Sequence, residues 1–291
     1  MRTVLSFVMR TVIIMTLFVV EVDAKSFLWE LNYKGDTSYI LGSIHMLKKS
    51  DFPLKDELEK SFSKSQYIVV EADISPNKVG EMLMVTMEKA GYKDGSKLAD
   101  HLSKATFEFA KKKMDELNLS IDNFENFKPW FLSMTITSME LMKIGFDPNY
   151  GIEKYFLNKS KGKTILELEG VSFQIGIFDN FSDKENDMFL LSSLKEAESL
   201  SENMDVMVRA WRDGDEESLA KIVKKNRDSS PNLEGIFKII IDKRNISMTG
   251  KIENWIKKGG KYFIIVGAAH LVGENGIIKL LREKGLVLKQ I

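Results

Sequence analysis

Two of the three histidines in this sequence occupy the same short motif, and this repetition is the strongest chemical signal in the chain. His45 ends the motif Gly-Ser-Ile-His at 42–45, and His270 ends Gly-Ala-Ala-His at 267–270. Each motif directly follows an apolar run of the kind that forms a buried strand. In an open α/β sheet, ligands bind at the carboxyl ends of the strands, so we expect both imidazoles in one crevice. The alternative is two hydrogen-bonded core histidines. His101 lacks such a context and is expected at the surface.

A carboxylate is expected at the same edge of the sheet. Glu71 directly continues the apolar run Tyr67–Val70, and a carboxylate there is costly unless it is paired, hydrogen-bonded or metal-bound. Two imidazoles and one carboxylate suit a divalent metal with open positions, such as Mn, Fe, Co or Zn. We therefore predict His45 and His270 as metal ligands, Glu71 as a further ligand or as the general base, and a metal-bound water as the nucleophile. A metal-free acid/base pair that uses the same residues is the nearest alternative. Asp73 is more easily explained as a turn residue.

Arg244 and Asn245 are the remaining candidates for chemistry. They lie inside a predicted helical stretch at 233–258. Arginine can hold an anionic group or a developing oxyanion, and asparagine can orient a water or a carbonyl. The alternative is an arginine that pairs with a surface acid. With His45, Glu71 and His270, these two residues complete the predicted catalytic set.

The elements that must position these residues alternate along the chain. Apolar runs rich in β-branched and aromatic residues predict six strands, several of them buried on both faces: Phe27–Leu31, Tyr39–Ile44, Tyr67–Glu71, Thr164–Leu168, Tyr262–Val266 and Leu286–Gln290. Helical patterns and their start and stop signals predict the segments between them: Pro53–Ser63, Pro76–Ala90, Ser103–Leu117, Pro129–Ile144, Ser182–Trp211, Glu216–Asn226, Leu233–Lys258 and Asn275–Lys284.

This order of elements predicts an α/β fold with a mostly parallel central sheet, flanking helices and a long helical middle segment. The strands cluster near the two ends of the chain, so the C-terminus is expected to complete the sheet. No linker rich in Pro, Gly and Ser divides the chain, and we therefore predict one domain over residues 25–291.

The first 24 residues have the composition of an export signal. Arg2 and Arg10 precede the apolar run 11–20, and small residues at 22 and 24 suit cleavage before Lys25. The run is too short for a spanning helix, which needs about 20 residues. An uncleaved anchor is the alternative, and translation from Met9 is a further one. We expect an exported protein, periplasmic or secreted, with no stable membrane span after cleavage.

Composition excludes several function classes. The 291 residues contain 42 basic and 42 acidic side chains, so the net charge is zero and gives no sign of nucleic-acid binding. The sequence has no cysteine, which excludes disulfides, iron–sulfur clusters, Cys-ligated zinc and cysteine nucleophiles. Oligomeric state is not readable from these features.

Taken together, the motifs resemble those of the TraB/GumN family of bacterial exported proteins, which is related to the Tiki metalloproteases of animals. The resemblance covers nearly the whole chain after the signal and rests on segments that occur in the same order: residues 27–30, 39–45, 68–73, 150–153, 155–156, 166–170, 174, 210–215, 244–245, 266–273 and 276.

The resemblance implies that the paired motifs and the strand-end glutamate are metal and catalytic residues, which places them on His45, His270 and Glu71. It implies a fold similar to that of erythromycin esterases and a haem-binding lipoprotein. Glu153 and Glu169 match family positions without an assigned role. Tiki-like members cleave peptides with a metal, whereas other members have different roles, so the implied function is an analogy. The expectation is a metal-dependent hydrolase acting on a peptide or a small molecule, and the alternative is a non-catalytic protein that sequesters a peptide, metal or haem-like ligand.

Overall fold

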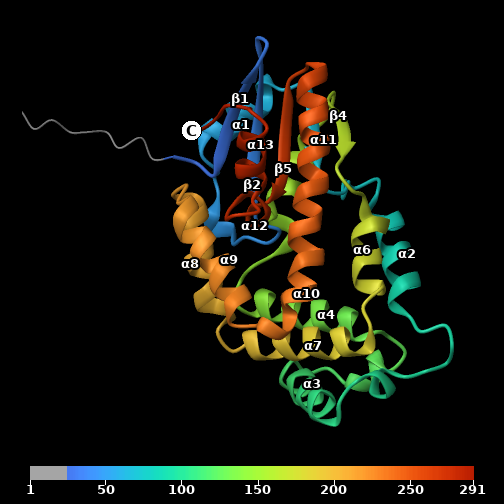
Figure 1. The fold of residues 1–291 in the computed structure, drawn as a ribbon. Helices are drawn as coiled ribbons and strands as arrows, with labels where there is room; N and C mark the ends of the chain where they lie inside the picture. The colour runs from blue at the N-terminus through green and yellow to red at the C-terminus, as the bar shows by residue number, and fades with distance from the viewer. Residues whose placement is uncertain (1–24) are drawn as a thin grey trace, which may run out of the picture.

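The computed structural model describes residues 25–291 and contains one six-stranded sheet in the order β4-β3-β5-β2-β1-β6 (Figure 1). All six predicted strands are present, with ends that differ by at most three residues from the predicted ones. Their bounds are β1 Leu28–Tyr33, β2 Asp36–Ser43, β3 Tyr67–Val70, β4 Thr164–Glu167, β5 Tyr262–Gly267 and β6 Leu288–Gln290. The C-terminal strand completes the sheet at the edge next to β1, as predicted from the sequence.

The four strands β4, β3, β5 and β2 run parallel, and only the pairings of β1 are antiparallel. Every residue of β5 is buried, which explains why its sequence is apolar throughout instead of alternating. Ser43 at the end of β2 is paired with Gly267 at the end of β5. This register brings the two histidine motifs to the same edge of the sheet.

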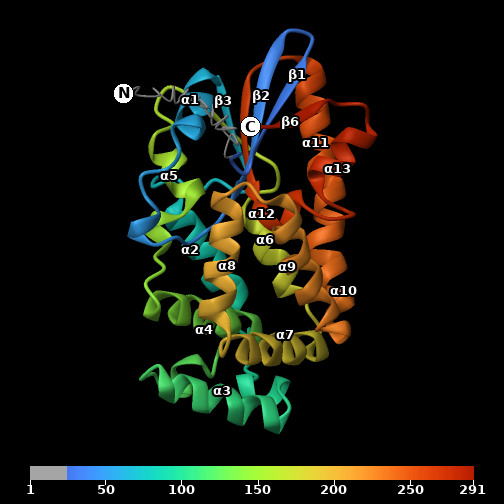
Figure 2. The ribbon, with the colours of Figure 1, turned by 90° about the vertical axis from the view of Figure 1, so that its left-hand side faces the viewer.

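Helices flank the sheet and also form a separate half of the molecule beyond its carboxyl edge (Figures 1 and 2). The long helix α11 runs beside the sheet, whereas α3, α4 and α7 lie at the opposite end of the molecule. The α-helices that match predicted segments are α1 Asp56–Lys64, α2 Val79–Ala90, α3 Lys104–Glu116, α4 Pro129–Lys143, α7 Asp183–Glu196, α8 Leu200–Arg212, α9 Glu216–Asp228, α10 Glu234–Phe237, α11 Arg244–Lys258 and α13 Ile277–Glu283.

Three helices were not predicted, and all three hold residues of the site described below. They are α5 Ile152–Asn158, α6 Val171–Asp179 and α12 Ala268–Leu271. Each has nine residues or fewer, which leaves too few turns for a clear helical period in the sequence. The predicted helix 182–211 is divided into α7 and α8. Pro53 follows a cis peptide bond and precedes α1, so it does not form the first turn of that helix as its type had suggested.

Two large apolar clusters correspond to the two halves. The main cluster surrounds the sheet and includes Trp29, Ile40 and Phe263, each fully or almost fully buried. A second cluster lies among α3, α4 and α7, where Met114 and Leu190 are fully buried. The site lies between these halves, where the strands end.

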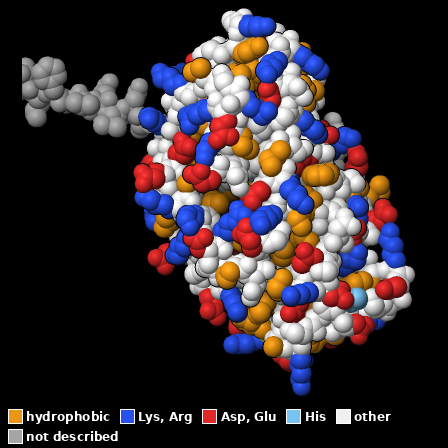
Figure 3. Space-filling model, in the orientation of Figure 1, with side chains coloured by type: hydrophobic (Ala, Val, Ile, Leu, Met, Phe, Trp, Pro, Cys, Tyr) orange, Lys and Arg blue, Asp and Glu red, His pale blue; other side chains and the backbone are white. Residues whose placement is uncertain are grey.

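The predicted signal at residues 1–24 lies outside the residues that the structure describes. Within residues 25–291, none of the helices combines the length and apolar character needed to cross a membrane. Figure 3 shows basic and acidic side chains interspersed over one face, as expected for a chain with equal numbers of each.

Gly151, the residue before α5, packs against the backbone of the segment that follows β2. A Cβ atom on Gly151 would lie 2.3 Å from the carbonyl oxygen of His45, which is a backbone atom that cannot rotate away. The next residue, Ile152, donates its N–H to the carbonyl of Ile44 at 3.1 Å. A side chain at 151 would therefore force the loop of His45 away from α5.

We predict that Gly151→Ala destabilises the protein by about 1–3 kcal/mol or more, because the added methyl overpacks a contact with backbone. The matched control is Gly80→Ala in α2, where the methyl would meet no atom within 4 Å. That control should gain about 0.5–1 kcal/mol, since alanine is the better helix former. Urea unfolding of the two variants measures both effects. Equal stability of the two variants would contradict the packing described.

Candidate active site

A pocket of about 420 Å³ opens at the carboxyl ends of the parallel strands. It contains four of the five predicted catalytic residues, and the fifth, Asn245, lies directly behind His270. The lining residues come from strand ends and from α4, α5, α6, α11 and α12: His45, Glu71, Ala72, Ile74, Met134, Glu153, Gln174, Phe178, Arg244 and His270. The sheet edge thus gathers side chains that are up to 225 residues apart, from His45 to His270.

The three predicted ligands meet above Gly267. A Cβ atom built there would lie 3.3 Å from Oε1 of Glu71, 3.4 Å from Cδ2 of His270 and 3.9 Å from Nε2 of His45. A side chain at 267 would enter the space that these groups share and would crowd the Glu71 carboxylate most closely. In the other motif, glycine is needed at position 42 for a different reason, because a Cβ atom there would lie 2.3 Å from the ring of the buried Phe27.

His45 is paired with a carboxylate. Its Nδ1 lies 2.8 Å from Oε1 of Glu153, and the same oxygen accepts a 2.5 Å hydrogen bond from the hydroxyl of Ser43. The imidazole is 71% exposed to the pocket, whereas the Glu153 side chain is only 8% exposed. The negative charge of Glu153 raises the pKa of His45 to about 9, so this ring is protonated at neutral pH. Nε2–H then faces the shared space.

His270 is paired with a neutral amide instead. Its Nδ1 lies 2.6 Å from Oδ1 of Asn245, whose Nδ2 donates to the carbonyl of Asn275 at 2.7 Å. Because the asparagine oxygen can only accept, Nδ1 of His270 must hold the proton, and Nε2 keeps its lone pair. Burial lowers the pKa of His270 to about 4. This imidazole is therefore neutral at physiological pH.

Glu71 is held by three donors. Its Oε1 accepts the N–H of Gly267 at 2.7 Å. Its Oε2 accepts from Arg244 at 2.5 Å and from the amide of Gln174 at 2.9 Å. Burial raises the pKa of Glu71, but the positive charges of Arg244 and His45 and the hydrogen bond from the Gly267 amide outweigh it, so the pKa is lowered overall. The carboxylate is ionised and fixed in position.

Arg244 joins two strand ends through two carboxylates. Its Nε and Nη2 donate to Glu169, the residue that follows β4 by two positions, at distances of 2.8–3.1 Å. Its Nη1 donates to the carbonyl of Ile240 at 3.1 Å. Most of its donors are therefore engaged, and it serves to position Glu71 rather than to offer a free donor to an oxyanion. Asn245 likewise positions His270 instead of facing a substrate carbonyl.

A π-helix precedes these two residues. Residues Lys238–Lys243 form this wider turn between α10 and α11. Such segments insert one extra residue per turn and occur often at functional sites. Here α11 begins at Arg244, and the consecutive side chains of Arg244 and Asn245 reach different partners, Glu71 and His270 respectively.

The donor set does not fit the three-ligand metal centre predicted from the sequence. Both oxygens of Glu71 already have partners, and across residues 25–291 no three side chains of His, Cys, Asp or Glu are grouped so that they could hold an ion. The two imidazoles alone could present Nε2 to a metal, because an oxygen holds Nδ1 of each ring. Metal dependence therefore stays a prediction from the sequence.

The structure gives roles to residues that the sequence left without one. Glu153 holds His45, Glu169 holds Arg244, and Gln174 bridges Glu71 and Glu169 through Nε2. Ser43, inside the first histidine motif, was missed as a site residue although its place one residue after Gly42 put it at the strand end.

Two other residues lie outside the pocket, although the His101 side chain is only 18% exposed. His101 lies in a short 3₁₀ turn, Leu98–His101, and its ring contacts Asp183 and Ser96, none of which lines the pocket. Asp73 accepts the N–H of Ser75 at 2.9 Å in a turn.

Comparison with known proteins gives a consistent family. The sequence matches the TraB/PrgY/gumN family over residues 27–290. It is 24% identical over 249 residues to the uncharacterized protein YbaP of Shigella flexneri, covering 84% of this chain and 88% of that protein. It is also 24% identical over 248 residues to YbaP of Escherichia coli K12, covering 84% and 87%. No solved structure gives a significant match.

We predict that Glu153→Gln lowers the pKa of His45 from about 9 toward its ordinary value of 6.5, because the negative charge that raises it is removed. The pairing stabilises the fold fully below pH 6.5, and this stabilisation is lost as the pH rises through 9. The stability of the wild type should therefore fall between pH 6.5 and pH 9, and the stability of the variant should not. Proton NMR titration of the histidine ring signals and urea unfolding at several pH values measure the two effects.

The control for this experiment is Glu81→Gln, which removes an exposed carboxylate paired with Lys78 in α2. It should leave the three histidine titrations unchanged. A wild-type His45 that titrates near 6.5 would contradict the proposed ion pair.

Proposed function

This chain belongs to the TraB/PrgY/gumN family, and on that premise we propose that it is a hydrolase that cleaves peptide bonds. The proposal depends on one observation: two imidazoles at neighbouring strand ends have opposite Nδ1 partners, a carboxylate for His45 and an amide oxygen for His270. A pair of groups whose surroundings separate their pKa values is the usual basis for assigning an acid and a base.

In this proposal His270 is the general base. Its Nε2 lone pair takes a proton from a water molecule, whose oxygen attacks the carbonyl carbon of the substrate. Asn245 keeps the proton on Nδ1 and so fixes the tautomer that can accept. The ionised carboxylate of Glu71 stabilises the positive charge that His270 gains, while Arg244, Gln174 and Gly267 hold that carboxylate in place.

His45 is the general acid. Its Nε2–H donates a proton to the nitrogen of the leaving amine as the carbon–nitrogen bond breaks, and Glu153 supports the charged form beforehand. Each turnover consumes one water and releases an acid and an amine. His270 then returns its proton to solvent and His45 takes one up, which restores both rings. General acid and general base catalysis each contribute about 10²–10⁴-fold.

Export is part of the same proposal. It rests on the composition of residues 1–24, and the activity would then operate in the periplasm or outside the cell. A protein without cysteine does not depend on disulfide formation in that compartment.

A second candidate is a non-catalytic protein that binds a peptide or a similar ligand in the same pocket. The observation that favours it is the complete pairing of Glu71, whose two oxygens already accept three hydrogen bonds. A site whose carboxylate is satisfied in this way could hold a ligand without reacting with it.

Substitution of His270 distinguishes the two candidates. For a hydrolase, we predict that His270→Gln lowers kcat by about 10²–10⁴-fold with little change in peptide affinity, since glutamine cannot accept the proton. His101→Gln is the matched control because its ring lies outside the pocket. Hydrolysis of a mixed peptide library, followed by mass spectrometry, measures turnover, and fluorescence anisotropy measures binding. Binding without turnover in the wild type would favour the second candidate, and Glu71→Gln should then alter binding alone.

The pH dependence of kcat/KM provides a second test. A base that must be neutral and an acid that must be protonated give a plateau between the pKa values of about 4 for His270 and about 9 for His45. Glu153→Gln should move the alkaline limit of the plateau to lower pH, because it lowers the pKa of the acid. A wild-type profile without this plateau, in which kcat/KM falls on both sides close to pH 6.5, would overturn these acid and base assignments.

The predicted metal is tested by elemental mass spectrometry of the wild type and the His45→Ala/His270→Ala double variant, each incubated with Mn, Co or Zn. About one ion per chain, lost in the double variant, would place a metal on the two imidazoles and assign the activation of water to it. Activity that survives EDTA in metal-free protein would support the acid and base mechanism instead.

A further inference from the structure

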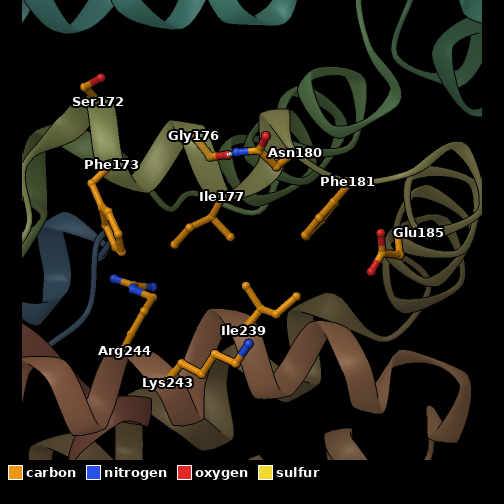
Figure 4. Close-up of a pocket in the computed structure, with 10 residues that line it drawn as sticks. All are labelled: Ser172, Phe173, Gly176, Ile177, Asn180, Phe181, Glu185, Ile239, Lys243 and Arg244. Atoms are coloured by element: carbon orange, nitrogen blue, oxygen red, sulfur yellow. Dashed lines mark hydrogen bonds between the residues drawn. The ribbon is translucent and has the colours of Figure 1, made fainter.

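We propose that a second pocket beside the catalytic one binds a large apolar side chain of the peptide substrate next to the scissile bond. This inference rests on the proposed function and specifies its substrate. The second pocket, here called the α6 pocket, has a volume of about 420 Å³ and lies between α6 and the helical segment that leads into α11 (Figure 4).

Apolar side chains face one another across the α6 pocket. Figure 4 shows Phe173, Ile177 and Phe181 on one side, facing Ile239 on the other. Phe173 is 52% exposed, so a large aromatic surface remains in contact with water at the pocket. Covering such a surface with an apolar group is favourable, in proportion to the apolar area that is removed from water.

Two features place the α6 pocket next to the catalytic pocket. Arg244 lines both of them. Helix α6 also lines both, with Gln174 and Phe178 facing the catalytic pocket and the preceding residues of each turn, Phe173 and Ile177, facing the α6 pocket. Positions four apart lie on one face of a helix, so adjacent faces of α6 border the two spaces. A peptide that places its carbonyl near the histidines can therefore place a neighbouring side chain in the α6 pocket.

The charges around the α6 pocket favour an uncharged side chain. Arg244 is already paired with Glu71 and Glu169, so an acidic side chain would have to compete with two buried carboxylates. A basic side chain would meet Arg244 and the adjacent Lys243, while Glu185, the carboxylate that lines the pocket, already accepts hydrogen bonds from Ser182. An acidic side chain could approach Lys243, but Lys243 is exposed and exposed ion pairs contribute little. Residues such as Phe, Leu and Met fill the space without either conflict.

The test uses internally quenched seven-residue peptides of Ala and Ser in which one position, moved along the peptide, is Phe, Leu, Gly, Asp or Lys. We expect Phe and Leu at one position beside the cleaved bond to give kcat/KM about 10- to 100-fold above Gly, Asp and Lys. Ile177→Trp fills the pocket and should reduce the ratio of Phe to Gly to within about threefold. Ile177→Ala enlarges it and should favour Trp at that position. Efficient cleavage without such a preference, or a preference that Ile177→Trp leaves intact, would overturn the proposal.

The control variant is Ile246→Trp, which introduces the same side chain on α11 at a site that is 65% exposed and outside both pockets. Its Phe-to-Gly ratio should equal that of the wild type.

Binding of fluorescein-labelled copies of the peptides to the His270→Gln variant separates this proposal from the proposed function. Preferential binding of the Phe peptide that Ile177→Trp abolishes, with no cleavage by the wild type, would support the α6 pocket and reject the hydrolase. If the peptides are neither bound nor cleaved, both the α6 pocket proposal and the proposed function are overturned.

Discussion

The buried ion pair between Glu71 and Arg244 is the constraint on which the rest of the site depends. The two side chains are 10% and 12% exposed, and their atoms lie 2.5 Å apart. A charge removed from water is costly unless its partner and its remaining hydrogen bonds are in place, so loss of either residue would leave the other uncompensated. Glu169, Gln174 and the Gly267 amide supply those remaining bonds. The end of β3 is thereby fixed to α11 and to β5.

Fixing α11 has a direct consequence for catalysis. Asn245 follows Arg244 in the chain, so the ion pair that locates one residue also locates the other against His270. The π-helix before them provides the local geometry in which the two neighbours reach different partners. Residues that do not touch the substrate in the proposed mechanism thus determine the tautomer of the residue that does.

The two histidine motifs look equivalent in the sequence but acquire opposite chemistry in the fold. His45 is exposed to the pocket beside a carboxylate, and His270 is buried beside an amide. The glycines also differ, because Gly42 makes room for Phe27 whereas Gly267 leaves open the space between the three side chains. The acid and base roles proposed here follow from those partners and not from the motif that the histidines share.

The sequence by itself determined the six strands, the sheet edge that gathers His45, Glu71 and His270, and the family. These features depend on local hydrophobic pattern and on the rule that parallel strands end at a common edge. Only the tertiary structure decided what each side chain contacts. Glu153 and Gln174 lie on α5 and α6, two helices too short to show a clear helical period in the sequence. The hydrogen bond from Arg244 to Glu71 depends on packing between segments that are 173 residues apart in the chain. Partner identity is a long-range property, because it is set by which elements pack together in space.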